Sequence, residues 1–405
     1  MVDEARWRRG DELLVRSEFA EARRAFEQVR RDAGEPTTVG IEVGFCVRMA
    51  QILLKVGRYE EALAHCRKGL VVARDPDQVG LLRGWAGLAH ATAGRPAAAR
   101  TEIVMGWRDL GERRGLARVI LERAEGNACA DEGQWRRAID AFSRGLEACT
   151  GLDVPWERSI AQFNIGDAYS ALGSHGQARN HLFAAFEVKS ELGDRWGLAH
   201  IHRALVRIHF DRGEIEEAAL QCDAGRELAH SVGDPKLEAG FHVESGRLAL
   251  RRGDLDAAQV ACSEARRLAR SCGARSEELA TQLLSASILL RQGDAARALT
   301  ALKPVLSEAS KYQATFEASV AHRLTALSHL EAGNFEGTRR ALSNARRLAR
   351  SHGNPYRRLE LDLIELQLER KEGSKEDFDE RVEAVRDRAS ALSASNVLTE
   401  LEQMR

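Results

Sequence analysis

The sequence is poor in the features that mark most membrane, secreted and nucleic-acid-binding proteins. Among its 405 residues there are 7 prolines, aromatic residues make up 5%, and the net charge is −1. A neutral balance gives no global attraction to nucleic acid or to anionic membranes. No apolar signal region follows Met1, and the longest stretch without charge, residues 279–290, is too short to span a bilayer. We therefore expect a cytoplasmic protein with no membrane partner, and nucleic acid as a disfavoured one.

Catalytic and metal-binding signatures are also missing. The sequence has no phosphate-binding loop, no His-Glu-x-x-His, no Gly-x-Ser-x-Gly and no Gly-x-Gly-x-x-Gly motif. Its 7 cysteines form an odd set without a Cys-x-x-Cys pair, which favours small buried thiols in a reducing compartment over a metal site. We expect a protein that is not an enzyme, with no catalytic residues, no metal and no cofactor.

A repeat organises the chain instead. Five tetrapeptides share the order glycine, polar residue, apolar residue, charged residue, and they begin at Gly57, Gly133, Gly213, Gly253 and Gly333. Weaker copies begin at Gly94, Gly173 and Gly293, and Ser17 and Gly373 extend the series to ten turns spaced about 40 residues apart. Such phasing predicts ten copies of one structural unit.

Small and apolar residues recur at fixed distances from each turn. In most units a small residue such as Gly126 lies seven residues before the turn. An alanine or a close substitute, such as Ala138, lies five residues after it, and an apolar residue such as Phe142 lies nine residues after it. These spacings lie on helix faces and predict two closely packed helices around each turn. We expect hairpins at 3–34, 38–74, 78–112, 114–151, 155–192, 195–232, 235–272, 276–312, 315–352 and, as a degenerate cap, 355–390, followed by a tail or short helix at 391–405.

The small residue before the turn, the Gly-polar-aromatic turn and the Ala-aromatic-Ala face resemble the tetratricopeptide repeat (TPR). The resemblance covers about residues 3–390, with units of about 40 residues instead of about 34. It implies an all-α, right-handed superhelical solenoid of about ten helix-turn-helix units, with residues 1–390 as a single domain. The longer units resemble those of spindle-orientation adaptors, peptide-responsive bacterial Rap-type regulators and helical sensor arms of signalling ATPases.

By resemblance to peptide-binding TPR proteins, groove-facing side chains lie ten, six and two residues before each turn. In the units that turn at Gly213, Gly253, Gly293 and Gly333, half of these twelve positions are arginine: Arg203, Arg207, Arg247, Arg251, Arg291 and Arg323. Guanidinium groups in a concave groove suit carboxylates or phosphates, and an acidic peptide fits best. The alternative is that these arginines are solvated or paired with acidic neighbours.

The N-terminal half shows a different pattern at the same positions. TPR proteins that clamp acidic C-termini use a basic residue with asparagine four positions later, and Arg123 with Asn127 reproduces this pair. The next unit has Phe163 and Asp167 instead, which departs from the clamp. These four residues join the six arginines as candidates for the partner-binding groove.

Three functions remain open. The first is a scaffold or adaptor that binds an extended or helical, acidic partner segment in its groove. The second is a regulatory or sensory module that binds a peptide and controls an effector in trans, such as a kinase, protease, ATPase or transcription regulator. RNA binding by the arginines is a third, which the neutral charge disfavours. The sequence identifies neither the partner nor the oligomeric state.

Overall fold

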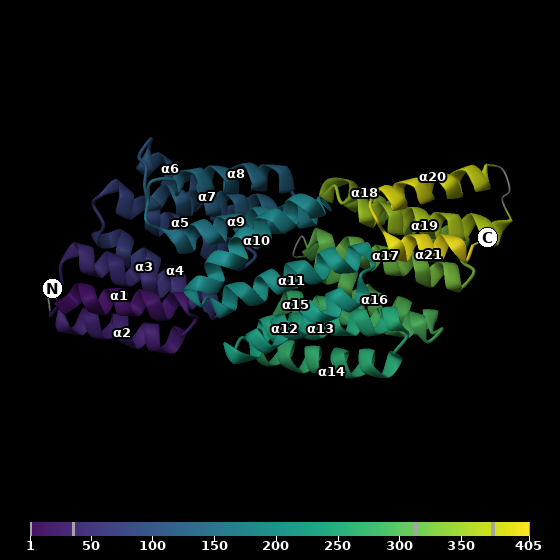
Figure 1. The fold of residues 1–405 in the computed structure, drawn as a ribbon, viewed down its shortest axis with the longest axis horizontal. Coiled ribbons are helices and arrows are strands. Elements are labelled where there is room, and N and C mark those ends of the chain that lie inside the picture. Colours follow the sequence, from purple (N-terminus) through teal and green to yellow (C-terminus); the bar gives the residue numbers. More distant parts are fainter. Residues whose placement is uncertain (1, 35–36, 312–313, 374–376, 405) are drawn as a thin grey trace. The chain divides into compact units, whose positions relative to one another are not determined.

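A computed structural model describes residues 2–34, 37–311, 314–373 and 377–404, and all regular structure in these ranges is α-helical (Figure 1). The all-α repeat fold expected from the sequence is confirmed. The chain divides into two compact units: unit 1 holds residues 1–169 and 176–201, and unit 2 holds residues 170–175 and 202–405. The expected boundary at residue 312 lies outside the described residues.

Unit 1 is built from helix pairs joined by tight turns. Its helices are α1 (Val2–Val15), α2 (Phe19–Asp32), α3 (Val39–Lys55), α4 (Tyr59–Val72), α5 (Pro76–Thr92), α6 (Pro96–Leu110), α7 (Leu116–Asp131), α8 (Trp135–Ala148), α9 (Pro155–Ala171), α10 (His175–Leu192) and the first part of α11 (Arg195–Arg212).

Unit 2 continues the pattern from the second part of α11. Its further helices are α12 (Ile215–Ser231), α13 (Pro235–Arg252), α14 (Leu255–Cys272), α15 (Arg275–Arg291), α16 (Ala295–Lys311), α17 (Thr315–Glu331), α18 (Phe335–His352), α19 (Pro355–Glu372), α20 (Phe378–Ala391) and α21 (Ser395–Glu402). Where the sequence expects a tail or short helix, the structure has α21.

The backbone conformation at each turn favours glycine. Gly57 and Gly213 both have φ of 77°, in the left-handed region where a side chain is unfavourable. Ser17 takes the corresponding place in the first hairpin with φ of 68° and is one of three described non-glycine residues at positive φ. The left-handed residue ends the first helix and lets the chain reverse into the second.

In several hairpins, a glycine before the turn makes room for the apolar residue after it. A Cβ atom added to Gly126 would overlap the ring of Phe142, and one added to Gly10 would overlap the ring of Phe26. Both rings are buried. The glycine therefore allows the two helices of a hairpin to approach closely, which explains why the two positions recur 16 residues apart.

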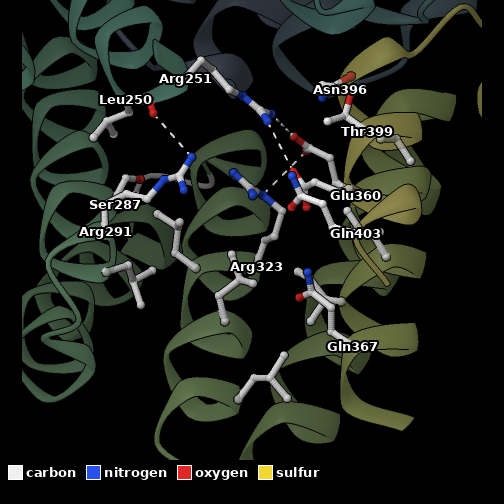
Figure 2. A pocket seen from close by; sticks show the side chains of 18 of the residues that line it. Leu250, Arg251, Ser287, Arg291, Arg323, Glu360, Gln367, Asn396, Thr399 and Gln403 are labelled. Carbon is white, nitrogen blue, oxygen red and sulfur yellow. Dashed lines mark hydrogen bonds and ion pairs between the residues drawn. The ribbon is translucent and has the colours of Figure 1, made fainter. Parts of the chain in front are cut away.

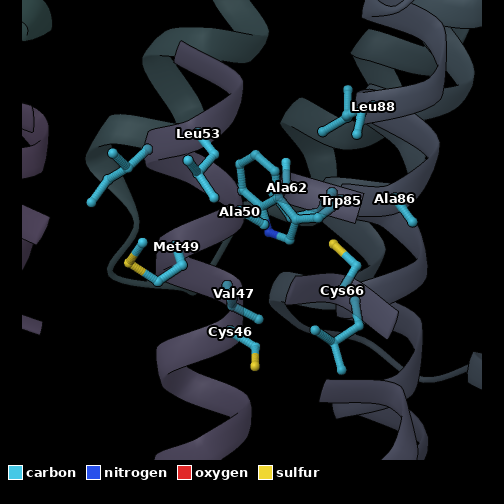
Figure 3. Close-up of a cluster of buried hydrophobic side chains, with 14 of the residues drawn as sticks. Cys46, Val47, Met49, Ala50, Leu53, Ala62, Cys66, Trp85, Ala86 and Leu88 are labelled. Carbon is cyan, nitrogen blue, oxygen red and sulfur yellow. The ribbon is translucent and has the colours of Figure 1, made fainter. Parts of the chain in front are cut away.

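Contacts between hairpins use the same small and apolar residues. Figure 3 shows Cys46, Ala50 and Leu53 of α3 in one cluster with Cys66 of α4 and Trp85 of α5. The thiols in this cluster fill space as small apolar groups, and burial raises the pKa of Cys46 to about 11. All seven cysteines are free; six are buried as expected, and Cys272 is exposed, contrary to that expectation.

We predict that Gly126→Ala destabilises unit 1 by about 1–3 kcal/mol, because the added methyl group displaces the Phe142 ring. Urea unfolding followed by tryptophan fluorescence measures this change, since all six tryptophans lie in unit 1. The matched control is Gly176→Ala in the first turn of α10, where a Cβ atom meets nothing within 4 Å. An equal effect of both variants would contradict the packing argument.

Candidate functional site

A cavity of about 1240 Å³ lies within unit 2. Its walls come mainly from the first helices of successive hairpins, α13, α15, α17 and α19, together with the end of α11 and with α21. Leucines such as Leu250, Leu327 and Leu363 line it beside polar and charged side chains. The cavity thus offers both apolar contact and charge.

Four of the six predicted arginines line this cavity, namely Arg247, Arg251, Arg291 and Arg323. The other two, Arg203 and Arg207, lie earlier on α11 and are not part of the lining. The guanidinium of Arg203 instead lies 3.6 Å from the carboxylate of Glu277 on α15. The structure therefore brings together the arginines of α13, α15 and α17.

Glu360 on α19 is the centre of the arginine cluster. Its carboxylate lies 3.2 Å from Arg357, 3.6 Å from Arg323 and 4.0 Å from Arg251, and Figure 2 shows the last two side chains pointing toward it. Burial alone raises the pKa of this carboxyl, but the charges of the arginines outweigh burial and lower the pKa to about 2. Glu360 is therefore ionised at neutral pH.

The remaining arginines of the lining are held in different ways. Arg247 forms an ion pair of 2.8 Å with Glu244 and lies over the ring of Phe210, 4.3 Å from its centroid. Arg291 is exposed and donates a hydrogen bond of 3.4 Å to the carbonyl oxygen of Leu250. Among the described residues, no carboxylate lies within ion-pair distance of Arg291. Arg370 is likewise exposed and donates a hydrogen bond of 3.4 Å to the carbonyl oxygen of Gln403. The charges of these two arginines are open to a ligand.

The lining as a whole carries an excess of positive charge. It contains six arginine and lysine side chains and three glutamates, which are Glu331, Glu360 and Glu400. The sequence left open the alternative that the arginines are paired with acidic neighbours, and the structure shows such pairs for Arg203, Arg247, Arg251 and Arg323. These pairs do not neutralise the cavity, because cationic groups in its lining outnumber anionic ones two to one.

Several lining residues were not among the predicted candidates. The spacing rule applied to the turn at Gly373 places Leu363, Gln367 and Lys371 in the groove, and all three line the cavity. Glu360 lies one helical turn before Leu363, outside the rule. The helix α21 lies beyond the repeat turn at Gly373, so the spacing rule assigns no groove positions to its residues.

The candidates of the N-terminal half lie in unit 1, on α7 and α9. Arg123 forms an ion pair of 2.8 Å with Glu157 and lies 4.5 Å from the ring centroid of Trp85, and burial lowers its pKa. Asn127 follows one turn later on α7. The guanidinium of Arg123 is thus already engaged within unit 1.

The other two candidates of that half lie on the next first helix. Phe163 on α9 packs with its ring 6.1 Å from that of His200, and Asp167 follows one turn later. Both side chains are half-buried. Neither residue lies on the cavity of unit 2.

Unit 1 also contains a charged cluster that the sequence does not predict. Lys55 at the end of α3 lies with Nζ 3.4 Å from the ring centroid of Trp196, and burial lowers its pKa to about 7. Nearby, Asp194 pairs with Lys189 at 2.8 Å and accepts a hydrogen bond from Trp156. Burial opposes the ionisation of Asp194, but the two lysines outweigh it and lower the pKa to about 2. The cluster joins α3 to the junction before α11.

The described residues contain no group of three or more histidine, cysteine, aspartate or glutamate side chains placed to hold a metal ion. No helix in the described ranges is long and apolar enough to cross a membrane.

Comparison with known proteins identifies the fold. The family model described as tetratricopeptide repeat matches residues 43–75, which cover α4 and most of α3. The fold is that of tetratricopeptide-repeat proteins. No curated protein sequence matches the chain.

Solved TPR structures resemble most of the chain. A Rap protein complexed with competence and sporulation factor has a TM-score of 0.68 at 12% identity, over 90% of this chain and 99% of that one. NprR in complex with its cognate peptide NprX has a TM-score of 0.59 at 14% identity, over 83% and 98%. A signal transduction ATPase with a TPR sensor from Pyrococcus horikoshii has a TM-score of 0.52 at 16% identity, over 93% and 57%. At these identities the likeness establishes the TPR fold.

We predict that Glu360→Gln removes an acid-sensitive part of the stability of unit 2. Because the pKa of Glu360 is lower in the folded state than in the unfolded chain, its contribution is present above pH 4.5 and lost as the pH falls toward 2. That contribution is roughly 3 kcal/mol.

Urea unfolding at several pH values, monitored by circular dichroism, tests this prediction. Wild type should lose its advantage over Glu360→Gln between pH 4.5 and 2.5. The matched control is Glu336→Gln on α18, whose side chain is 82% exposed and paired only with Arg340. Parallel pH profiles for wild type and Glu360→Gln would contradict the role given to Glu360.

Proposed function

We propose that this chain is a non-enzymatic protein-interaction module that binds an acidic peptide segment in the cavity of unit 2. The observation that carries the proposal is the twofold excess of cationic over anionic side chains in that lining. A concave, partly desolvated surface strengthens such a charge excess relative to bulk water. The ligand it fits carries carboxylates.

The lining also suggests how a peptide would be held. Arg291 has no carboxylate partner among the described residues, so it is free to form a bidentate ion pair with a ligand carboxylate. Leu327 and Leu363 offer apolar contact beside it. A segment that alternates acidic and apolar side chains matches both features.

A second candidate is a regulatory module that binds a peptide and controls an effector in trans. The structural likeness to two complexes favours it, namely a Rap protein with competence and sporulation factor and NprR with its cognate peptide NprX. Both candidates require the same peptide site.

We also propose that the protein acts in the cytoplasm, which fits its seven free cysteines.

We predict that a fluorescein-labelled peptide of alternating glutamate and leucine binds the wild-type chain, with an affinity that falls as salt rises. Arg291→Glu should weaken binding roughly tenfold or more, since it replaces an attraction by a repulsion. Fluorescence anisotropy at two salt concentrations measures both effects.

The matched control is Lys303→Glu, which makes the same change of charge at an exposed position on α16 outside the cavity. It should bind as wild type does. A peptide of alternating lysine and leucine should not bind. Equal binding of both peptides, or equal weakening by both variants, would contradict the proposed site.

A further inference from the structure

The helix α21 forms one wall of the cavity, mainly with polar side chains. Asn396, Thr399, Glu400 and Gln403 all belong to the lining, and Figure 2 shows Asn396, Thr399 and Gln403 beside Glu360 and opposite Arg291. Glu400 is the acidic residue that α21 contributes to the cavity. An acidic group from the chain itself therefore already occupies part of the cationic surface.

Two polar contacts join α21 to helices far from it in sequence. The carboxylate of Glu400 lies 3.5 Å from the guanidinium of Arg251 on α13, 149 residues away. The hydroxyl of Ser395 donates a hydrogen bond of 2.8 Å to the carbonyl oxygen of Arg212 at the end of α11. Through these contacts α21 reaches α11 and α13, two helices that also line the cavity.

The apolar side chains on and just after α21 pack within the last hairpins, and two of them also reach the cavity lining. Val397, Leu401 and Met404 are buried in one cluster with Leu363 of α19 and Val385 of α20. This packing keeps Glu400 close to Arg251 whether or not the two are in contact. A group tethered in this way competes with a free ligand at a high effective concentration.

We propose that Glu400 occupies on Arg251 the position of a ligand carboxylate, so that α21 and an acidic peptide compete for the cavity. This inference rests on the proposed function and names the regulation of the same site. It assigns α21 the part of an internal competitor, which sets the concentration at which a peptide is bound.

The ion pair between Glu400 and Arg251 is weak enough for a ligand carboxylate to displace Glu400. The side chains of Glu400 and Arg251 are 39% and 23% exposed, so water and salt screen their ion pair. Partly exposed pairs of this kind are weak, and an incoming carboxylate can replace them. Arg251 keeps Glu360 as a second partner at 4.0 Å, so losing Glu400 does not leave it without an acidic neighbour.

The test uses the full chain and the fluorescein-labelled peptide of alternating glutamate and leucine. Glu400→Gln should bind this peptide about two- to fivefold more tightly than wild type, because it removes the competitor and keeps Arg251. The matched control is Glu402→Gln, which makes the same change of charge on an exposed residue of α21 outside the lining. It should bind as wild type does.

Hydrogen exchange of the wild-type chain gives a second readout, in which competition by α21 predicts faster exchange of its amides when peptide binds. Saturating peptide should speed exchange of the amides at residues 395–404, because the ligand displaces the polar side of α21, while it slows exchange in α15 and α17. Slower exchange at 395–404 would mean that α21 helps to bind the peptide, and this would overturn the competition.

The outcomes separate this inference from the function on which it rests. If wild type, Glu400→Gln and Glu402→Gln bind the peptide equally while Arg291→Glu does not, α21 is no competitor and the peptide site remains. If none of the chains binds the peptide, including Glu400→Gln, the proposed function and the competition are both overturned.

Discussion

Close approach of two helices at a small residue is the constraint on which the rest of the structure depends. In several hairpins, the apolar residue nine positions after the turn lies against a glycine whose place a Cβ atom could not take, as Phe142 does at Gly126. Interiors pack densely and tolerate little change of volume, so this contact sets the spacing of the two helices. Repetition about every 40 residues then gives each first helix the same orientation toward its neighbours within a unit.

The arginine cluster follows from that repetition. Arg251 and Arg291 lie two residues before successive turns, and Arg323 lies ten residues before the next one. Because the first helices present equivalent faces, these side chains reach one cavity, where Arg251 and Arg323 meet Glu360 of α19. Charges that are weak and scattered on a single helix become a concentrated field when several helices surround the same space.

Features set by neighbouring residues were predictable from the sequence. The turns, the glycine notches and the alanines on the helix faces each depend on residues within one hairpin, and the all-α TPR fold follows from them. The groove register, which uses only the distance of a residue from its turn, predicts Arg247, Arg251, Arg291 and Arg323 on one surface. The same register extended by one turn also reaches Gln367 and Lys371.

The partners of these arginines were beyond sequence reasoning, because they depend on contacts between distant helices. Glu360 precedes the register by one helical turn, and Glu400 lies 149 residues from Arg251 on a helix beyond the repeat turn at Gly373. A repeat length of 40 residues does not determine the curvature of the stacked helices, so it cannot predict which helices face each other across a cavity. The division into two compact units is hidden for the same reason, since the repeat continues through it.

The central claim is that the cavity of unit 2 is a peptide site. Photo-crosslinking tests it most directly, with an acidic peptide that carries a benzophenone group and with mass spectrometry to locate the adducts. The account predicts adducts on the first helices of unit 2 that line the cavity, within residues 247–251, 287–291, 323–331 and 360–371. Adducts confined to unit 1, or to the second helices α12, α14, α16 and α18, would contradict it.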